Sequence, residues 1–411
     1  MVTPPAGNNK LKSARITAGY GSQQKLADEL GVAVRQVRRW ESSTPPWPQA
    51  EIGEALSRVL GQDLGALGFT PPNGVVPGRR RSPLAVSGSA AAGLAAVPRQ
   101  ATAPLQPASA ANDFAAITQA HRRLYWTVAP ATLHPAAAAH SALGCALLLE
   151  SAGQTRRTLA AALAETYLLA GRVEFFDLRT AETAQQTLLR ALQAAGEADD
   201  PLLGAAVLAH MAFIPAWDGR REDAVERLSA ARTYARRGSA SAELLAWLDA
   251  VEAECETRCG NTRTALNLIS HAEDLLAAVT PHSAPTPDWF DWFTPVRLAG
   301  FKGHTQLTAG HLPQARETLL AVLEALKSGE KQRTVILGDL AAVEAAAGHP
   351  EEACQHALSA LDQLEETWYA MGMDRVREVR RALAPHQHDQ CVRELDDRLY
   401  GWTTTVSALT R

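Results

Sequence analysis

The stretch from Ser22 to Glu41 reads Ser-Gln-Gln-Lys-Leu-Ala-Asp-Glu-Leu-Gly-Val-Ala-Val-Arg-Gln-Val-Arg-Arg-Trp-Glu, and it predicts two short helices joined by a tight turn. Ser22 can cap the first helix, because its hydroxyl can accept a hydrogen bond from a free backbone N–H of the first turn. Gly31 stands where that helix ends, and glycine tolerates the left-handed conformation that a helix end requires. The small side chain of Ala27 lets a second helix approach closely.

The second helix begins at about Val34 and has two distinct faces. Val37 and Trp40, three positions apart, face the core. The opposite face is polar and basic and carries Arg35, Gln36, Arg38 and Arg39. This pattern predicts a helix-turn-helix whose second helix fits the major groove of DNA. The alternative is a basic, solvated helix in an ordinary bundle.

The spacing of these residues resembles the XRE-type (Cro/CI-like) family of helix-turn-helix DNA-binding domains. The positions that match are Ser22 and Gln23 at the start of the family's second helix, Gly31 at its turn, and Val37, Trp40 and Glu41 at the end of its recognition helix. The sequence departs from the family at Ala33, where a Ser or Thr cap is usual, and the loss of that cap costs about 1 kcal/mol. The resemblance covers roughly residues 8–70.

The second helix of the predicted motif, the recognition helix, has side chains that can contact both bases and phosphates. Arginine can bond guanine with two hydrogen bonds, and glutamine can do the same with adenine. We therefore assign base contacts to Arg35, Gln36 and Arg39, with Val34 placed to contact a thymine methyl group, and phosphate contacts to Gln23, Lys25 and Arg38. In the alternative interpretation, Arg38 and Arg39 pair with Glu41 or with other nearby acids.

Helices on either side complete a small N-terminal domain over residues 1–70. We expect a first helix over residues 10–18, with Leu11, Ala14 and Ile16 facing inward, and another over residues 49–60. The proline-rich loop at residues 42–48 cannot be helical throughout. Leu64, Leu67 and Phe69 are expected to close a five-helix module.

The composition of the whole chain bounds its class. The chain has 411 residues, 46% of them hydrophobic, and a net charge of −4, which suits a globular protein of two or more domains. Basic charge is local to the first 40 residues, as in a DNA-binding module fused to another domain. The five cysteines form no disulfide framework, which favours reduced thiols in the cytoplasm. No secretory signal and no membrane-spanning segment are expected.

Residues 71–111 are rich in Pro, Gly, Ser and Ala, which predicts a flexible linker. Arg80 and Arg81 precede a weakly apolar stretch and together resemble a twin-arginine export signal. Because a DNA-binding domain precedes them and serines and glycines interrupt the stretch, we favour a linker in a cytoplasmic protein.

Residues 112–411 show helix after helix and no alternating strand pattern, so the predicted fold class is all-α. Asn112 or Asp113 can cap the first helix. A scheme of helix, glycine turn and helix recurs, with glycines at positions 171, 219, 260, 310 and 348. The unequal gaps resemble a degenerate tetratricopeptide-like array, which implies an α-solenoid with a concave surface. An irregular helical bundle without a groove is the alternative.

One aromatic stretch, residues 287–295, is unusual in a chain with few aromatic residues. We expect Trp289, Trp292 and Phe293 to share a helical face and to line a ligand site, with Asp291 or Asp288 as its polar anchor. The alternative is core packing where two repeats meet.

Other candidate sites are poor. Cys255 and Cys259 lack further metal ligands nearby, and His386, His388 and Cys391 lack an evident fourth ligand. We find no nucleophile elbow, phosphate loop, zinc-protease helix or paired carboxylates. We therefore expect no enzymatic activity, metal or cofactor.

These observations predict a cytoplasmic transcriptional regulator that binds double-stranded DNA, has no membrane partner, and forms a homodimer through its helical-repeat domain. The resemblance implies a peptide effector, or another small ligand, bound by that domain. The rival interpretation is a protein-interaction scaffold with a vestigial DNA-binding domain, and an all-helical enzyme is a third.

Overall fold

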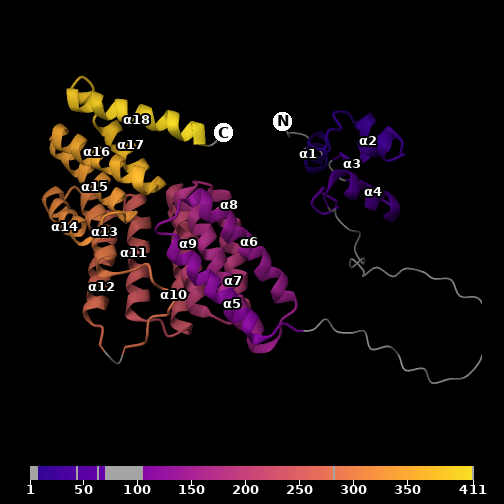
Figure 1. Cartoon of the computed structure of the whole chain (residues 1–411), viewed down its shortest axis with the longest axis horizontal. Helices are drawn as coiled ribbons and strands as arrows, with labels where there is room; N and C mark the ends of the chain where they lie inside the picture. Colours follow the sequence, from indigo (N-terminus) through magenta and orange to yellow (C-terminus); the bar gives the residue numbers. More distant parts are fainter. Residues whose placement is uncertain (1–7, 43–44, 63, 70–104, 281–282, 410–411) are drawn as a thin grey trace, which may run out of the picture. The chain divides into compact units, whose positions relative to one another are not determined.

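The computed structural model describes residues 8–42, 45–62, 64–69, 105–280 and 283–409. It is all-α, with eighteen α-helices and no strand among these residues (Figure 1). The chain divides into two compact units, residues 1–98 and 99–411. The segment around Arg80 and Arg81, and most of the predicted linker, lie outside the described residues.

The N-terminal unit contains four helices: α1 (Asn9–Thr17), α2 (Gln23–Glu29), α3 (Val34–Trp40) and α4 (Ala50–Leu60). As predicted, the Ser22 hydroxyl caps α2 by accepting from the backbone N–H of Lys25, and Gly31 adopts a φ of +64° in the turn. Ala33 supplies no side-chain cap to α3. The core gathers apolar side chains from all four helices, among them Leu11, Leu26, Val37, Trp40 and Leu56.

Two details of this unit differ from the prediction. Ile16 is 54% exposed, whereas the neighbouring Arg15 is buried because its guanidinium has polar partners inside the unit. Residues 64–68 form turns rather than a fifth helix, although Leu67 and Phe69 are buried as expected. Leu64 packs against the same core, so this segment contributes the predicted apolar contacts from a turn conformation.

The C-terminal unit is a succession of helices, connected mostly by short turns (Figure 1). They are α5 (Ala108–Leu124), α6 (Pro130–Leu149), α7 (Gly153–Arg172), α8 (Ala181–Ala198), α9 (Pro201–Trp217), α10 (Arg221–Arg237), α11 (Ala242–Arg258), α12 (Thr262–Ala277), α13 (Pro295–Thr308), α14 (Leu312–Ala325), α15 (Gln332–Ala347), α16 (Pro350–Glu366), α17 (Ala370–Ala382) and α18 (Gln390–Leu409). A π-helical turn, Val173–Asp177, extends α7, and a 3-10 turn, Ala384–His386, follows α17.

The predicted glycine turns join consecutive helices into pairs. Gly219, Gly260, Gly310 and Gly348 all have φ between +71° and +82°, a range that side-chain-bearing residues rarely adopt. They connect α9 to α10, α11 to α12, α13 to α14 and α15 to α16, and the two helices of each pair pack against each other. The C-terminal unit is therefore an α-solenoid of tetratricopeptide-like helix pairs with an irregular period.

Gly171 is not a turn glycine, which corrects the prediction of an earlier repeat copy. It lies within α7, where a Cβ atom would come within 2.7 Å of the Leu188 Cγ on α8. Its role is close helix packing, which the sequence does not distinguish from a turn.

The first helix of the C-terminal unit begins at Ala108, four residues before the predicted cap at Asn112. Pro107 occupies the cap position, and Asn112 and Asp113 are exposed inside the helix. The predicted linker end at residue 111 is thus wrong by one helical turn.

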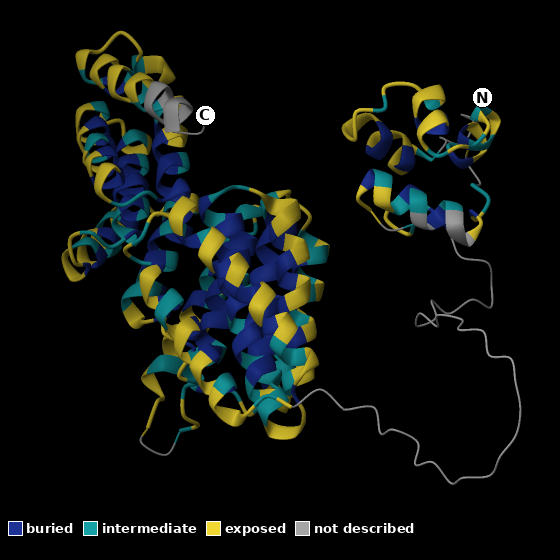
Figure 2. Cartoon of the chain, turned by 45° about the vertical axis from the view of Figure 1, so that its right-hand side comes forward, coloured by how far each residue is buried: buried dark blue, intermediate teal, exposed yellow. Residues whose placement is uncertain are grey.

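The core of the C-terminal unit is densest around α9 and α11 (Figure 2). Every residue of α9 from Leu203 to Ala216 is buried, which explains why this helix is apolar all round. Helix α6, of 20 residues, is long and apolar enough by length and composition to cross a membrane. It packs against α7 here, and buries His140 and Ser141.

Candidate functional site

Helix α3 presents a basic outer face. Arg35, Arg38 and Arg39 are exposed, and none of the three has an ion-pair partner among the described residues. Val37 and Trp40, on the inner face, are fully buried and fix the orientation of the helix on the unit. Three guanidinium groups therefore remain available to an external anion.

The carboxylate of Glu41 is held inside the unit and does not pair with α3, which corrects the alternative interpretation of Arg38 and Arg39. Its Oε1 lies 2.6 Å from the Arg15 Nε, and its Oε2 accepts from the Gln23 Nε2 at 2.6 Å. The Gln23 amide, predicted to contact phosphate, is thus engaged by Glu41 in this structure.

The other predicted contact residues lie at the edges of the basic face. Lys25 on α2 is exposed, while Val34 and Gln36 on α3 are half-buried. The assignment of Val34 and Gln36 to base contacts stays a prediction.

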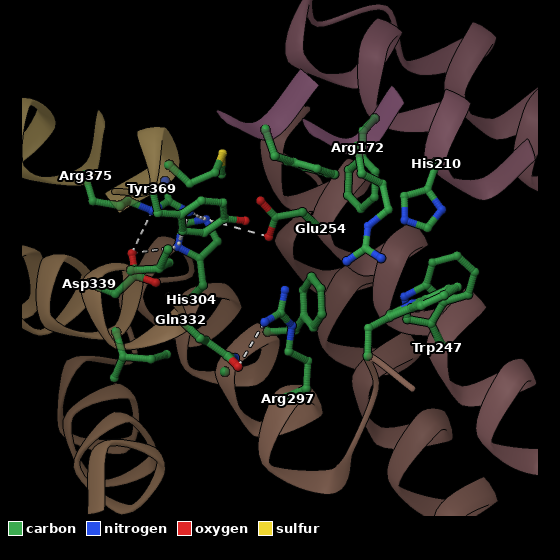
Figure 3. A pocket seen from close by; sticks show the side chains of 18 of the residues that line it. Arg172, His210, Trp247, Glu254, Arg297, His304, Gln332, Asp339, Tyr369 and Arg375 are labelled. Atoms are coloured by element: carbon green, nitrogen blue, oxygen red, sulfur yellow. Dashed lines mark hydrogen bonds and ion pairs between the residues drawn. The ribbon is translucent and has the colours of Figure 1, made fainter. Parts of the chain in front are cut away.

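The C-terminal unit contains a cavity that is open to solvent (Figure 3). Its walls come from α7, α9, α11, α13, α15 and α17, together with the π-helical turn and three residues outside the helices, Tyr125, Trp292 and Tyr369. No lining residue belongs to α8, α10, α12, α14 or α16. The first helix of each pair thus faces the cavity, as expected for the inner surface of a solenoid.

One end of the cavity is cationic and aromatic. The Arg172 side chain, at the end of α7, lies over the rings of Tyr125 and Trp292, with its Cζ 4.9 and 4.8 Å from their centroids. Arg297 on α13 donates to the Gln332 Oε1 at 3.0 Å. Both guanidinium groups point into the cavity (Figure 3).

The other end of the cavity carries a network of paired charges. The Asp339 Oδ1 lies 2.9 Å from the Arg375 Nε and 3.4 Å from the His304 Nδ1. Burial alone would raise the pKa of Asp339, but Arg375 and His304 outweigh it and hold that pKa below its ordinary value. Glu254 completes the network beside His304 and Arg258.

His210 stands between the aromatic rings of the cavity as a neutral group. Burial, with a further contribution from Arg172, lowers its pKa to about 3. Its Nδ1 lies 2.8 Å from the Ala206 carbonyl oxygen, which accepts if that nitrogen carries the proton. The cavity wall therefore gains no positive charge from His210 near neutral pH.

The aromatic stretch at residues 287–295 is not helical, because Pro287 and Pro295 bracket an irregular segment. Of its predicted ligand residues, only Trp292 lines the cavity. Trp289 and Phe293 are buried in the core, which agrees with the alternative of core packing. Asp291 pairs with Arg122 at 3.4 Å, and Asp288 contributes only a backbone carbonyl to Arg122.

The predicted thiol and imidazole candidates do not converge. Cys255 is buried in the core, and its pKa is raised by burial, while Cys259 lies at the helix end. His386 is half-buried and His388 is exposed. In the part of the chain that the structure describes, no three His, Cys, Asp or Glu side chains are arranged to hold a metal ion.

A helix-turn-helix family model matches residues 11–67. The N-terminal unit is a helix-turn-helix domain. This match confirms the XRE-type resemblance carried by Ser22 to Glu41, and the matched range contains both α2 and α3. No curated protein matches the chain.

Two solved structures are similar to the chain at low sequence identity. BtubC from P. vanneervenii is 15% identical, with a TM-score of 0.41, over 58% of this chain and 92% of that one. A Rap protein complexed with Competence and Sporulation Factor is 10% identical, with a TM-score of 0.46, over 74% of this chain and 99% of that one.

The helix-turn-helix domain contains one feature that the sequence analysis missed, the pair Arg15–Glu41. The side chains of Arg15 and Glu41 are 5% and 7% exposed, so this pair joins α1 to the end of α3 inside the domain. An arginine among apolar core positions of the first helix was the available signal. In the C-terminal unit the corresponding signal was polar residues within apolar helices, such as His210 and Asp339.

Proposed function

We propose that this protein is a transcriptional regulator of the cytoplasm that binds specific DNA sequences through its helix-turn-helix domain. The observation that carries the proposal is the exposed face of α3, where Arg35, Arg38 and Arg39 lack anionic partners among the described residues. In helix-turn-helix proteins the second helix of the motif lies in the major groove. Arginine on that helix can read guanine through O6 and N7.

A homodimer is part of this proposal. A seven-residue recognition helix contacts few base pairs, so two copies on half-sites about 34–36 Å apart would supply the specificity that one lacks. The C-terminal helical unit is the part of the chain large enough to hold two copies together.

The cavity of the C-terminal unit supports a sensing role for a small ligand or a short peptide. A ligand alters DNA affinity only if it binds two states of the protein unequally. The usual scale of such coupling is about 1–3 kcal/mol, or roughly 5–150-fold in affinity. The proposal includes no enzymatic activity.

Electrophoretic retardation of genomic fragments by the full-length protein tests the DNA-binding proposal. We expect a small subset of fragments to be retained, to share a motif, and to be released steeply as salt rises, because phosphate contacts displace counterions. Retention of none, or equal retention of all, would instead favour a scaffold with a vestigial DNA-binding domain.

A further inference from the structure

We infer that the cavity of the C-terminal unit binds an organic carboxylate with an apolar body, whose carboxylate lies between Arg172 and Arg297. The inference takes this cavity to be the ligand site of the proposed function and names the chemistry of its ligand.

The first argument is the unpaired charge of Arg172. Arg172 is only 7% exposed, yet among the residues that the structure describes no carboxylate lies within 4 Å of its guanidinium and no hydrogen-bond partner contacts it. Every other buried Arg or Lys side chain of the described residues has a carboxylate partner, for example Lys331 with Asp177 and Arg375 with Asp339. Buried charges are normally paired, because leaving water is costly. Within the described part of the chain, Arg172 therefore has no anionic partner, and a bound anion would supply one.

The second argument is the position of Arg297. Arg297 is half-buried, and the one hydrogen-bond partner of its guanidinium among the described residues is the neutral amide oxygen of Gln332. Its Cζ lies 5.7 Å from the Trp126 ring, and the Arg172 Cζ lies 5.9 Å from the same ring. Two guanidinium groups beside one indole repel each other, and an anion placed between them would remove that cost. Arginine forks match the two oxygens of a carboxylate.

The third argument concerns the rest of the ligand. Besides the two arginines, the cavity is lined by the aromatic rings of Phe176, Phe213, Trp217 and Trp247. The far end carries Glu254 and Asp339, which would repel a multiply charged anion. A ligand with one negative charge and an apolar body suits the two arginines, the aromatic wall and the acidic far end of the cavity.

The test is calorimetric titration of the full-length protein, without DNA, with four probes. They are 3-phenylpropionate, its neutral amide 3-phenylpropionamide, acetate and inorganic phosphate. Because hydrogen bonds to charged groups are the strong ones, we expect 3-phenylpropionate to bind about ten-fold or more tightly than the amide. Acetate, which lacks the apolar body, should bind more weakly still.

Two variants locate the binding. Arg172→Gln and Arg297→Gln should each weaken 3-phenylpropionate binding about ten-fold or more and leave the amide little changed. Arg297 is half-buried, so its variant keeps the test decisive if Arg172→Gln loses helicity. Arg263→Gln is the matched control, since Arg263 is exposed on α12, which does not line the cavity.

Several results would overturn the inference. Equal affinity for the acid and the amide would mean an apolar pocket without an anion site. Tighter binding of phosphate than of 3-phenylpropionate would mean an inorganic anion site. If no probe binds, the cavity does not take a ligand of this class. If both variants leave 3-phenylpropionate binding unaffected, the carboxylate binds elsewhere. Since DNA is absent, these outcomes are independent of the retardation assay, in which the regulator proposal itself can fail.

Discussion

Arg15 and Glu41 form a buried ion pair between α1 and the end of the recognition helix α3, with the Arg15 Nε 2.6 Å from the Glu41 Oε1. Arg15 also donates to the Tyr20 carbonyl oxygen at 2.7 Å, and the second oxygen of Glu41 accepts from Gln23. One carboxylate thus connects α1, α2 and α3. The orientation of the basic face depends on this contact as well as on Trp40.

Replacing Glu41 with Gln should destabilise the helix-turn-helix domain by about 3 kcal/mol, because it leaves the Arg15 charge buried without a partner. Hydrogen exchange of the segment containing α2 and α3 in the full-length protein measures the loss. Glu29→Gln is the control, since Glu29 is exposed on α2 and has no ion-pair partner among the described residues. Unchanged protection in Glu41→Gln would show that the pair contributes nothing.

The neutral His210 predicts a pH dependence of the stability of the C-terminal unit. The pKa of His210 is about 3 in the folded protein and 6.5 in the unfolded chain. Between these two pH values the unfolded chain binds a proton at His210 and the folded protein does not. This contribution is fully present above pH 6.5 and is lost as the pH falls, by about 1.4 kcal/mol per unit. Urea unfolding at pH 7.5 and 5.5 should show that loss for the natural protein. His210→Asn should lose less over this range, whereas a change of the exposed His388 to Asn should leave the loss as it was.

Gly338 allows α15 and α17 to approach at the charged end of the cavity. A methyl group at this position would overlap the Arg375 Cβ, next to the Asp339–Arg375 ion pair. We expect Gly338→Ala to cost about 1–3 kcal/mol, the usual price of overpacking. Gly196→Ala in α8 is the matched control. That glycine is exposed in a helix, with open space around a new Cβ, so the variant should gain about 0.5–1 kcal/mol. Equal melting temperatures for the two variants would contradict the packing argument.

Features fixed by neighbours in sequence could be predicted. The cap at Ser22, the turn at Gly31 and the inward pair Val37 and Trp40 depend on residues within one helical turn. The same holds for the turn glycines, such as Gly219, where a positive φ is a local requirement.

Features fixed by residues that are distant in the sequence could not be predicted. Gly171 is a packing glycine because Leu188 of another helix lies against it. Trp292 faces the cavity while Trp289 is core, a difference set by the irregular path between two prolines. The role of Arg172 emerges only when helices far apart in the sequence are brought around one cavity.

The central claim is that α3 reads DNA, and the affinity of Arg39→Ala and Arg35→Ala variants tests it most directly. Fluorescence anisotropy of the full-length protein would compare a fragment selected in the retardation assay with random DNA of equal length. Arg58→Ala, a change on the exposed end of α4, serves as control. The account predicts a loss of about 1–3 kcal/mol on the selected fragment for each α3 variant and a much smaller loss on random DNA. Equal losses on both DNAs, or no loss on either, would contradict it.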